Sequence, residues 1–204
     1  MKISTLLFHL DHGSLSLPSF ARGYVWKPSQ TISLFNSLYR LYPVGSFIFW
    51  TPTSPTSARL HEPVKDTRPI ELTVDGQQRI AAIYTAMRGH VPGFLDDQQR
   101  QLCPLCFNIE NAVFGFYRPD MKDDPHWINL PDLFNREQIV RGEILDGLYQ
   151  TPAGPTHIGE YSQRLNRLGS IMDRYVHVEY LPNGTSPEEA AEIYLLANGG
   201  GGRK

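Results

Sequence analysis

The stretch from residue 70 to residue 89 constrains the fold of this chain more than any other part. Ile70 to Val74 is a short apolar run, typical of a buried strand, and Asp75-Gly76 after it predicts a tight turn. Four apolar residues then recur at the i, i+3, i+4 and i+7 spacing of a helix: Ile80, Ile83, Tyr84 and Met87. Residues 77–79 are therefore expected in the first turn of a helix that follows a strand.

The first turn of such a helix favours anions, because its N–H groups lack intrahelical acceptors and the helix dipole is positive there. Gly76 would let a ligand approach the main chain, and Arg79 would add a forked, charged donor. The same residues also fit a structural role, because Asp75 with Gln78 three residues later forms a capping box. Both interpretations stay open, since a capped helix still offers its remaining N–H groups.

Length and composition fit one folded domain. The chain has 204 residues, of which 41% are hydrophobic and 20% charged, and its formal charge of −2 argues against a globally basic nucleic-acid binder. A local basic face built from Arg22, Arg79 and Arg88 stays open. No apolar run approaches the roughly 20 residues of a membrane helix, and no secretory signal is present, so the expected location is the cytoplasm.

Elsewhere the patterns predict helices, strands and hairpins in irregular alternation. We expect helices over 28–41, 161–174 and 187–197, strands over 46–50 and 175–181, a hairpin of 106–109 with 113–117, and a strand or short helix over 3–10. Loops are expected over 51–69, 118–126 and 149–158, with a short helical piece at 94–101. This alternation favours an α+β fold with a mixed sheet.

The spacing of the cysteines argues against a zinc site, and the absence of a phosphate-loop pattern argues against a P-loop nucleotide site. Cys103 and Cys106 form a lone C-P-L-C, and His90 and His126 do not follow at the spacing of a zinc finger, so we expect two reduced cysteines and no metal site. The chain has no G-x-x-x-x-G-K-S/T pattern, which argues against an ordinary P-loop NTPase. It also contains no recognisable nuclease motif.

Four short sequence segments together point to a family. LPSFARGYVW at 17–26, LYPVGSFIFW at 41–50, LTVDGQQRIAAIY at 72–84 and AEIYLLANGG at 191–200 occur in this order. The set resembles the N-terminal domain of GmrSD-type restriction endonucleases, from about Leu17 to Gly200. The resemblance implies one domain over residues 1–200, with a tail at 201–204. It also implies a ParB/sulfiredoxin-like mixed sheet in which a strand–turn–helix carries nucleotide phosphates.

The function that the resemblance implies is regulatory. Such a domain binds a nucleoside triphosphate with Mg²⁺, hydrolyses it, and belongs to a bacterial DNA-restriction or anti-phage defence system. Cutting is the task of a separate HNH-type nuclease domain or subunit, with DNA as a further partner of the system. We therefore expect no DNA cleavage by this chain alone, and NTP hydrolysis is its candidate enzymatic activity.

The resemblance also marks candidate site residues. Those expected to bind nucleotide phosphates are Arg22, Gly76, Gln77, Gln78, Arg79, Asn198 and Gly199. Asp75 and Gln78 are the candidate catalytic residues, with Asp75 positioning Mg²⁺ or a water, and Tyr24 and Trp26 would stack or support the loop. Structural alternatives stay open: Asp75 as a helix cap, Asn198 with Gly199 as a helix end, and Arg22 as a surface arginine stacked on an aromatic ring.

Two departures from the family pattern affect the function. Ala21 stands where the family usually carries Gln, and alanine makes no side-chain hydrogen bond. The Asn198-Gly199-Gly200 word is followed by only four residues, which suggests a truncated domain. Besides the NTPase, the sequence therefore leaves open a non-catalytic module that senses DNA or a partner and has a degenerate nucleotide pocket.

Overall fold

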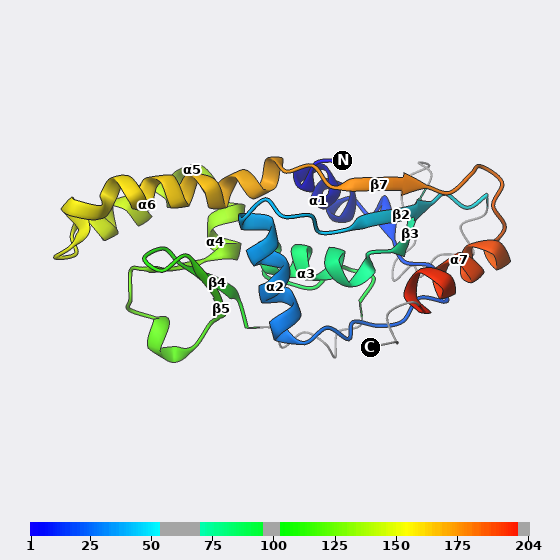
Figure 1. Cartoon of the computed structure of the whole chain (residues 1–204), viewed down its shortest axis with the longest axis horizontal. Helices are drawn as coiled ribbons and strands as arrows, with labels where there is room; N and C mark the ends of the chain where they lie inside the picture. The colour runs from blue at the N-terminus through cyan, green and yellow to red at the C-terminus, as the bar shows by residue number, and fades with distance from the viewer. Residues whose placement is uncertain (54–69, 96–102, 200–204) are drawn as a thin grey trace.

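The computed structural model of the chain describes residues 1–53, 70–95 and 103–199 (Figure 1). Within these residues, helices and strands alternate irregularly around two small sheets, which confirms the predicted α+β class. The elements are α1 (Ile3–Asp11), β1 (Leu15–Ser16), α2 (Pro28–Tyr39), β2 (Ser46–Trp50), β3 (Glu71–Asp75), α3 (Gln77–Arg88), β4 (Leu105–Asn108), β5 (Val113–Phe116), η3 (Pro119–Met121), β6 (Trp127–Asn129), α4 (Leu130–Asn135), α5 (Glu137–Tyr149), α6 (Gly154–Gly169), η4 (Ser170–Asp173), β7 (His177–Tyr180) and α7 (Pro187–Gly199).

A mixed four-stranded sheet in the order β1-β3-β2-β7 positions the strand that leads into α3. β2 and β3 are antiparallel, with Phe49 opposite Thr73 and Trp50 opposite Leu72. β1 and β7 extend the sheet in parallel on its two sides. The strands predicted over 46–50 and 70–74 are therefore confirmed.

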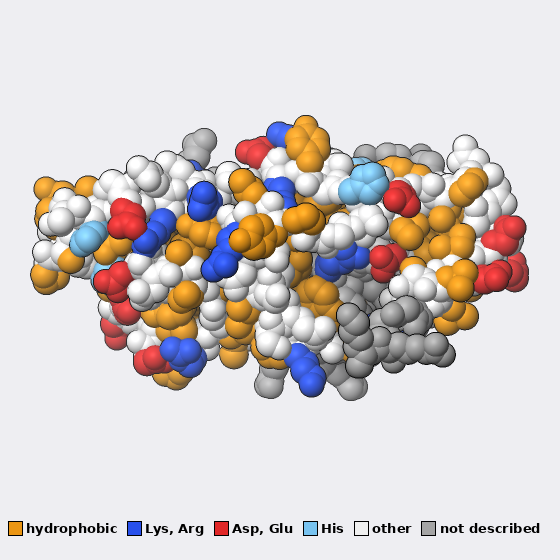
Figure 2. Space-filling model, viewed as in Figure 1, with side chains coloured by type: hydrophobic (Ala, Val, Ile, Leu, Met, Phe, Trp, Pro, Cys, Tyr) orange, Lys and Arg blue, Asp and Glu red, His pale blue; other side chains and the backbone are white. Residues whose placement is uncertain are grey.

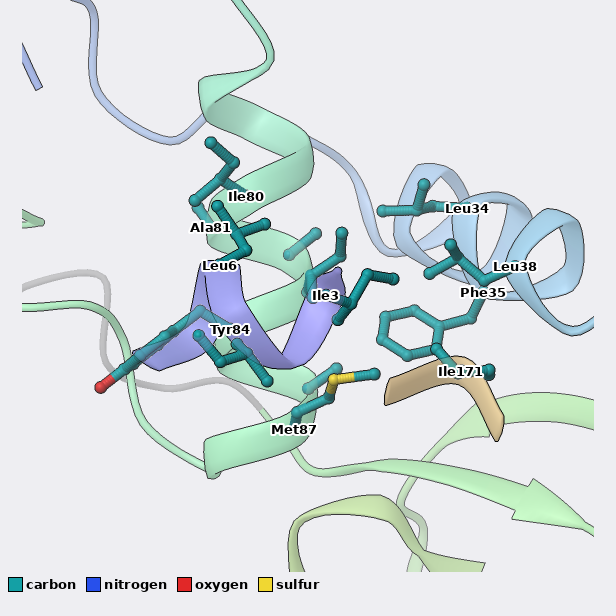
Figure 3. Packing of buried hydrophobic residues seen from close by; sticks show 14 of the residues in the cluster. Ile3, Leu6, Leu34, Phe35, Leu38, Ile80, Ala81, Tyr84, Met87 and Ile171 are labelled. Carbon is teal, nitrogen blue, oxygen red and sulfur yellow. The ribbon is translucent and has the colours of Figure 1, made fainter. Parts of the chain in front are cut away.

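Helix α3 lies in the hydrophobic core (Figure 3). Ile80, Ile83 and Met87 are fully buried, which confirms the apolar face that their spacing predicted. Apolar side chains from α1, α2 and η4 pack in the same cluster: Ile3, Leu6, Leu34, Phe35, Leu38 and Ile171. Close packing against these neighbours therefore holds α3 rigidly in place.

A second, antiparallel sheet in the order β5-β4-β6 lies away from β7 and α7 (Figure 1). Its β4–β5 hairpin confirms the one predicted from the sequence. Helices α5 and α6 run side by side and extend from this end of the molecule (Figure 1). The α5–α6 pair and α7 thus lie at opposite ends of the long axis of the molecule.

The structure corrects two predictions in the last third of the chain. The loop predicted over 149–158 is wrong from Gly154 onward, because α6 begins there with Pro155 in its first turn, a position where proline is well tolerated. The helix predicted over 161–174 therefore starts earlier, ends at Gly169 and continues as the 3₁₀ helix η4. Residues 3–10, for which the sequence left a strand or a short helix open, belong to the helix α1.

Other predicted elements are confirmed or lie outside the described residues. The helix predicted from Ser186 begins as expected, because the Ser186 hydroxyl accepts from the Glu189 N–H at 3.2 Å and the Ser186 N–H donates to Glu189 Oε2 at 2.8 Å. The strand predicted over 175–181 is shorter, and Tyr180 on it is 54% exposed. Most of the predicted loop over 51–69 and of the helical piece over 94–101 lies outside the described residues.

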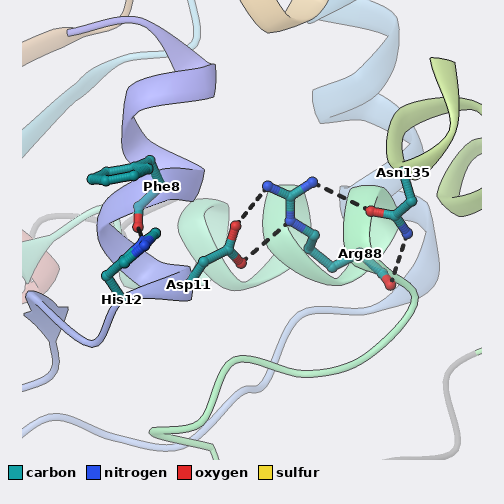
Figure 4. A network of polar contacts seen from close by, with 5 residues as sticks. All are labelled: Phe8, Asp11, His12, Arg88 and Asn135. Carbon is teal, nitrogen blue, oxygen red and sulfur yellow. Dashed lines mark hydrogen bonds and ion pairs between the residues drawn. The ribbon is translucent and has the colours of Figure 1, made fainter. Parts of the chain in front are cut away.

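Arg88 belongs to a polar network at the far end of α3 (Figure 4). Its Nη2 and Nε donate to the two Asp11 carboxylate oxygens at 2.6 and 3.3 Å, and Nη1 donates to Asn135 Oδ1 at 3.3 Å. Arg88 lies nine positions after Arg79 in the same helix, or roughly 14 Å away along the axis. The basic face suggested for Arg22, Arg79 and Arg88 is therefore not formed.

The surface carries charges of both signs. Figure 2 shows Lys and Arg side chains interspersed with Asp and Glu over the face in view, in keeping with the formal charge of −2. Across the described ranges, none of the helices is both long and apolar enough to cross a membrane. The face in view therefore carries no broad field of positive charge.

The end of α2 holds a strained leucine. Leu41 has a φ of +62°, and the Tyr42 and Leu41 N–H groups donate to the carbonyls of Ser37 and Leu38, the pattern of a Schellman motif. That motif normally places glycine at the position of Leu41, because a Cβ in this conformation costs about 1 kcal/mol. The Leu41 side chain is 65% exposed, so packing offsets little of this strain.

Replacing Leu41 by glycine should raise the free energy of unfolding by about 1 kcal/mol, because glycine adopts the left-handed conformation without a Cβ contact. Urea unfolding followed by circular dichroism measures the change. Leu41→Ala keeps the Cβ and is the matched control, which should not gain stability. A Leu41→Gly protein less stable than its parent would show that the leucine side chain contributes more than the strain costs.

Candidate functional site

The turn between β3 and α3 is built around Gly76. This residue has a φ of +91°, and a Cβ added to it would lie 2.4 Å from Cδ1 of Phe47. Only glycine fits both the conformation and the space. Gly76, rather than Asp75, is the N-cap residue of α3, so the capping box predicted for Asp75 and Gln78 is wrong.

The first turn of α3 presents main-chain N–H groups. The first intrahelical bond runs from the Ile80 N–H to the Gly76 carbonyl at 2.9 Å. The N–H groups of residues 77–79 precede it and have no acceptor inside the helix. The strand–turn–helix that the sequence predicted is therefore confirmed, and a helix end of this kind is suited to anions, which for this chain stays a prediction.

Gln78 holds the 17–26 loop beside this helix end. Its Oε1 accepts from the Val25 N–H at 2.8 Å, and its Nε2 donates to the Gly23 carbonyl at 2.9 Å. Gln78 is buried, so water competes little for these two bonds. Its side chain therefore positions the loop, a role that the sequence did not predict.

Gln77 links the same helix end to α7. Its Nε2 donates to the Tyr194 hydroxyl at 3.2 Å, and that hydroxyl also accepts from the Arg22 N–H at 3.2 Å. Gln77 is 3% exposed, and its Oε1 is buried with no hydrogen-bond donor in the described part of the chain. A buried acceptor without a donor is costly, so this oxygen is a candidate contact for a bound group.

Arg79 turns away from the open end of the helix and toward the start of β2. Its Nη1 donates to the Val44 carbonyl at 2.5 Å, and its Nη2 donates to the Ser46 carbonyl at 2.8 Å and to Asp75 Oδ2 at 3.1 Å. The guanidinium also stacks over the Phe47 ring at 4.8 Å. Burial lowers the pKa of Arg79, and the Asp75 carboxylate acts against that shift. These contacts give Arg79 a structural task, whatever its part in phosphate binding.

The 17–26 loop contributes one exposed cation and several buried side chains. The Arg22 side chain is exposed, while Ala21 beside it is 1% exposed and belongs to the hydrophobic core. The Tyr24 hydroxyl bonds Thr31 Oγ1 at 3.1 Å, and burial raises the pKa of Tyr24. Trp26 is partly buried against the core. Tyr24 and Trp26 thus support the loop, as one of their predicted roles required.

Tyr24 also closes one side of an apolar pocket along α3. Ala82, Thr85 and Phe116 are among its other walls. The pocket lies beyond the first turn of α3, so it is distinct from the anion-binding geometry at Gly76.

Asn198 and Gly199 are the last residues of α7. The Asn198 Nδ2 donates to the Tyr194 carbonyl at 2.8 Å, one helical turn earlier. The structural alternative, in which Asn198 and Gly199 form a helix end, is therefore confirmed, and their binding of a phosphate stays a prediction. The sequence analysis missed Tyr194 itself, although its spacing from buried Ala190 at i−4 marks the inward face of this helix.

The cysteines and histidines that the structure describes do not gather into a metal site. Within 1–53, 70–95 and 103–199, no group of three or more His, Cys, Asp or Glu side chains is placed to hold a metal ion. Cys103 and Cys106 are both free thiols, and burial raises the pKa of Cys106 to about 11. A protonated, buried thiol is a poor metal ligand.

Arg79→Ala is expected to lower the free energy of unfolding by about 2–3 kcal/mol, because it leaves two carbonyls and the Asp75 carboxylate without their charged donor. Urea unfolding measures the loss. Arg79→Lys, which keeps the charge but not the fork, should recover only part of it. An Arg79→Ala protein with full stability and weakened nucleotide affinity would instead show that Arg79 serves the ligand rather than the fold.

Comparison with known families identifies the chain. A sequence model of the family described as "GmrSD restriction endonuclease, N-terminal domain" matches residues 3–201, whereas among curated proteins no relative matches. The match covers nearly all of the 204 residues and confirms the resemblance carried by the four sequence segments. Membership makes the chain a component of a restriction or defence system, and the family implies a nuclease partner domain elsewhere. The chain therefore belongs to the GmrSD restriction endonuclease family, as its N-terminal domain.

Proposed function

We propose that the first turn of α3 and the 17–26 loop beside it bind the phosphates of a nucleoside triphosphate with Mg²⁺. The observation that carries this proposal is the turn at Gly76, which leaves three successive main-chain N–H groups at the positive end of a helix fixed in the core. Arg22 adds an exposed charged donor on the loop that Gln78 holds there. The buried Gln77 Oε1 would accept a hydrogen bond from a ribose hydroxyl or a bound water.

Asp75 is the residue that fits Mg²⁺. Magnesium in nucleotide sites is commonly held by one or two carboxylates together with phosphate oxygens, and Asp75 lies directly before Gly76 with its side chain 27% exposed. Its Oδ2 already accepts from Arg79, so the carboxylate is held in one orientation. A bound Mg²⁺ would neutralise phosphate charge as it develops during hydrolysis.

In this function, hydrolysis of the bound nucleotide is the regulatory step. We assign the cutting of DNA to the nuclease partner domain and none of it to this chain. Gln78 remains the second candidate catalytic residue, but its amide is engaged with Gly23 and Val25. A catalytic contact from Gln78 would therefore require the loop to move.

The second candidate function is a non-catalytic module that senses DNA or a partner. Two observations favour it: Ala21 is buried where the family usually has Gln, and Arg79 directs its donors to Val44, Ser46 and Asp75. In this alternative the first turn of α3 keeps its shape but binds no nucleotide.

Thermal unfolding with each of the four ribonucleoside triphosphates, with and without Mg²⁺, distinguishes the two functions. A working site predicts a rise in Tm of about 5–10 °C at a ligand concentration 100-fold above Kd, larger with Mg²⁺. Arg22→Ala should reduce the rise without changing the Tm of the free protein, because the Arg22 side chain is exposed. Arg40→Ala removes one exposed charge at the end of α2 and is the matched control. An unchanged Tm with all four nucleotides would favour the sensing module.

A further inference from the structure

Tyr194 is the point where α7 meets both parts of the proposed nucleotide site. Its hydroxyl accepts from the Gln77 side chain in the first turn of α3 and from the Arg22 N–H in the 17–26 loop, both at 3.2 Å. These partners are 117 and 172 residues away in the sequence. Tyr194 is 7% exposed, so the two bonds are shielded from water.

Besides these two bonds, α7 is held by Thr185 just before it and by apolar side chains as far along as Ile193 and Tyr194. The Trp50 indole N–H donates to the Thr185 carbonyl at 3.1 Å, and Ala190 in the second turn is fully buried. Near the end, Tyr194 packs on Phe20 with ring centroids 5.5 Å apart, whereas Leu195 and Leu196 are 66% and 71% exposed. Figure 1 shows α7 at one end of the molecule, where it contacts β3. The last turn, beyond Tyr194, is therefore the part of α7 whose attachment depends most on the contacts that Tyr194 makes.

The hydrogen bonds around Tyr194 are poised to change when an anion binds. The Arg22 N–H now donates to a neutral hydroxyl, and a phosphate is a stronger, charge-assisted acceptor. The neighbouring Gln77 Oε1 is buried without a donor among the described residues, so this set of bonds is incomplete before any ligand arrives. A phosphate at the helix end would take the Arg22 N–H and leave Tyr194 with only one donor.

We propose that Tyr194 couples occupancy of the nucleotide site to the attachment of α7. Phosphate binding withdraws the Arg22 N–H from the Tyr194 hydroxyl, and the last turns of α7 are released from the loop. α7 is then the moving part through which the bound nucleotide changes the surface of this domain. This coupling rests on the proposed nucleotide binding, and by linkage any change that releases α7 also favours the nucleotide.

Hydrogen–deuterium exchange of α7 tests the coupling. The 204-residue chain is compared free and with each ribonucleoside triphosphate plus Mg²⁺, with binding verified by thermal shift in the same samples. In the parent protein, amides over 190–199 should exchange about 3- to 10-fold faster when nucleotide is bound, the ratio expected for loss of one hydrogen bond. Exchange over 77–88 should not become faster, because α3 stays packed in the core.

Tyr194→Phe removes the hydroxyl and keeps the ring against Phe20. Its α7 amides should exchange fast without nucleotide and show no further change on binding, while nucleotide affinity stays equal or rises a few-fold. Tyr180→Phe, which removes a hydroxyl from a 54% exposed side chain on β7, should behave like the parent. The loss of the nucleotide response, rather than faster exchange by itself, separates a coupling role from a purely structural one.

Three results would overturn the coupling. If the parent protein binds nucleotide while α7 exchange stays unchanged, the coupling is wrong and the nucleotide site stands. A Tyr194→Phe protein that still responds to nucleotide as the parent does also excludes the coupling and leaves the nucleotide site in place. If no nucleotide binds the parent protein, the proposed function fails and the coupling fails with it.

Discussion

The left-handed turn at Gly76 is the constraint on which the site depends. A φ of +91° and a Phe47 ring that leaves no room for a Cβ restrict this position to glycine. The turn redirects the chain from the sheet into α3, which the core then holds on its apolar face. Because strand and helix are both fixed, the N–H groups of the first turn are held in place at a helix end where Gly76, Gln77 and Gln78 are buried.

The side chains that follow Gly76 hold neighbouring segments around this turn. Gln78 fixes the 17–26 loop, Gln77 reaches Tyr194 on α7, and Arg79 ties α3 to the start of β2. The side chains of residues 77–79, which resemble a set of phosphate ligands, therefore act largely as a structural junction. The main chain at Gly76 and the exposed Arg22 are left as the groups best placed for an anion. Because main chain and side chains have different tasks here, residues 76–79 can shape the site and join three segments at once.

Local patterns predicted α2, β2, β3, α3 and the β4–β5 hairpin from the sequence. Each carries an apolar period together with a clear turn or cap, so local preference and burial agree. The start of α6 was missed because Pro152 and the Gly154-Pro155 pair indicate a loop, although proline also fits the first turn of a helix. The capping box failed for a comparable reason: Asp75 and Gln78 have the right spacing, but each has a stronger partner elsewhere in the fold.

The candidate site was predicted in outline and not in its side-chain contacts. The strand–turn–helix follows from periodicity, whereas the bonds from Gln78 to Gly23 and Val25 join segments more than 50 residues apart. Spacing along a chain carries no information about such pairs, so Tyr194 could not be linked to Gln77 before the structure. The apolar pocket beside Tyr24 was missed for the same reason, since its walls come from α2, α3, β4, β5 and the loops.

Titration of ¹⁵N-labelled protein with each ribonucleoside triphosphate and Mg²⁺, followed by ¹H–¹⁵N correlation spectra, tests the central claim most directly. We expect the largest amide shifts on residues 76–79 and on Arg22, where the main-chain N–H groups would face the phosphates. Shifts confined to the walls of the apolar pocket, such as Thr85 and Phe116, would contradict it. So would spectra that none of the four nucleotides changes.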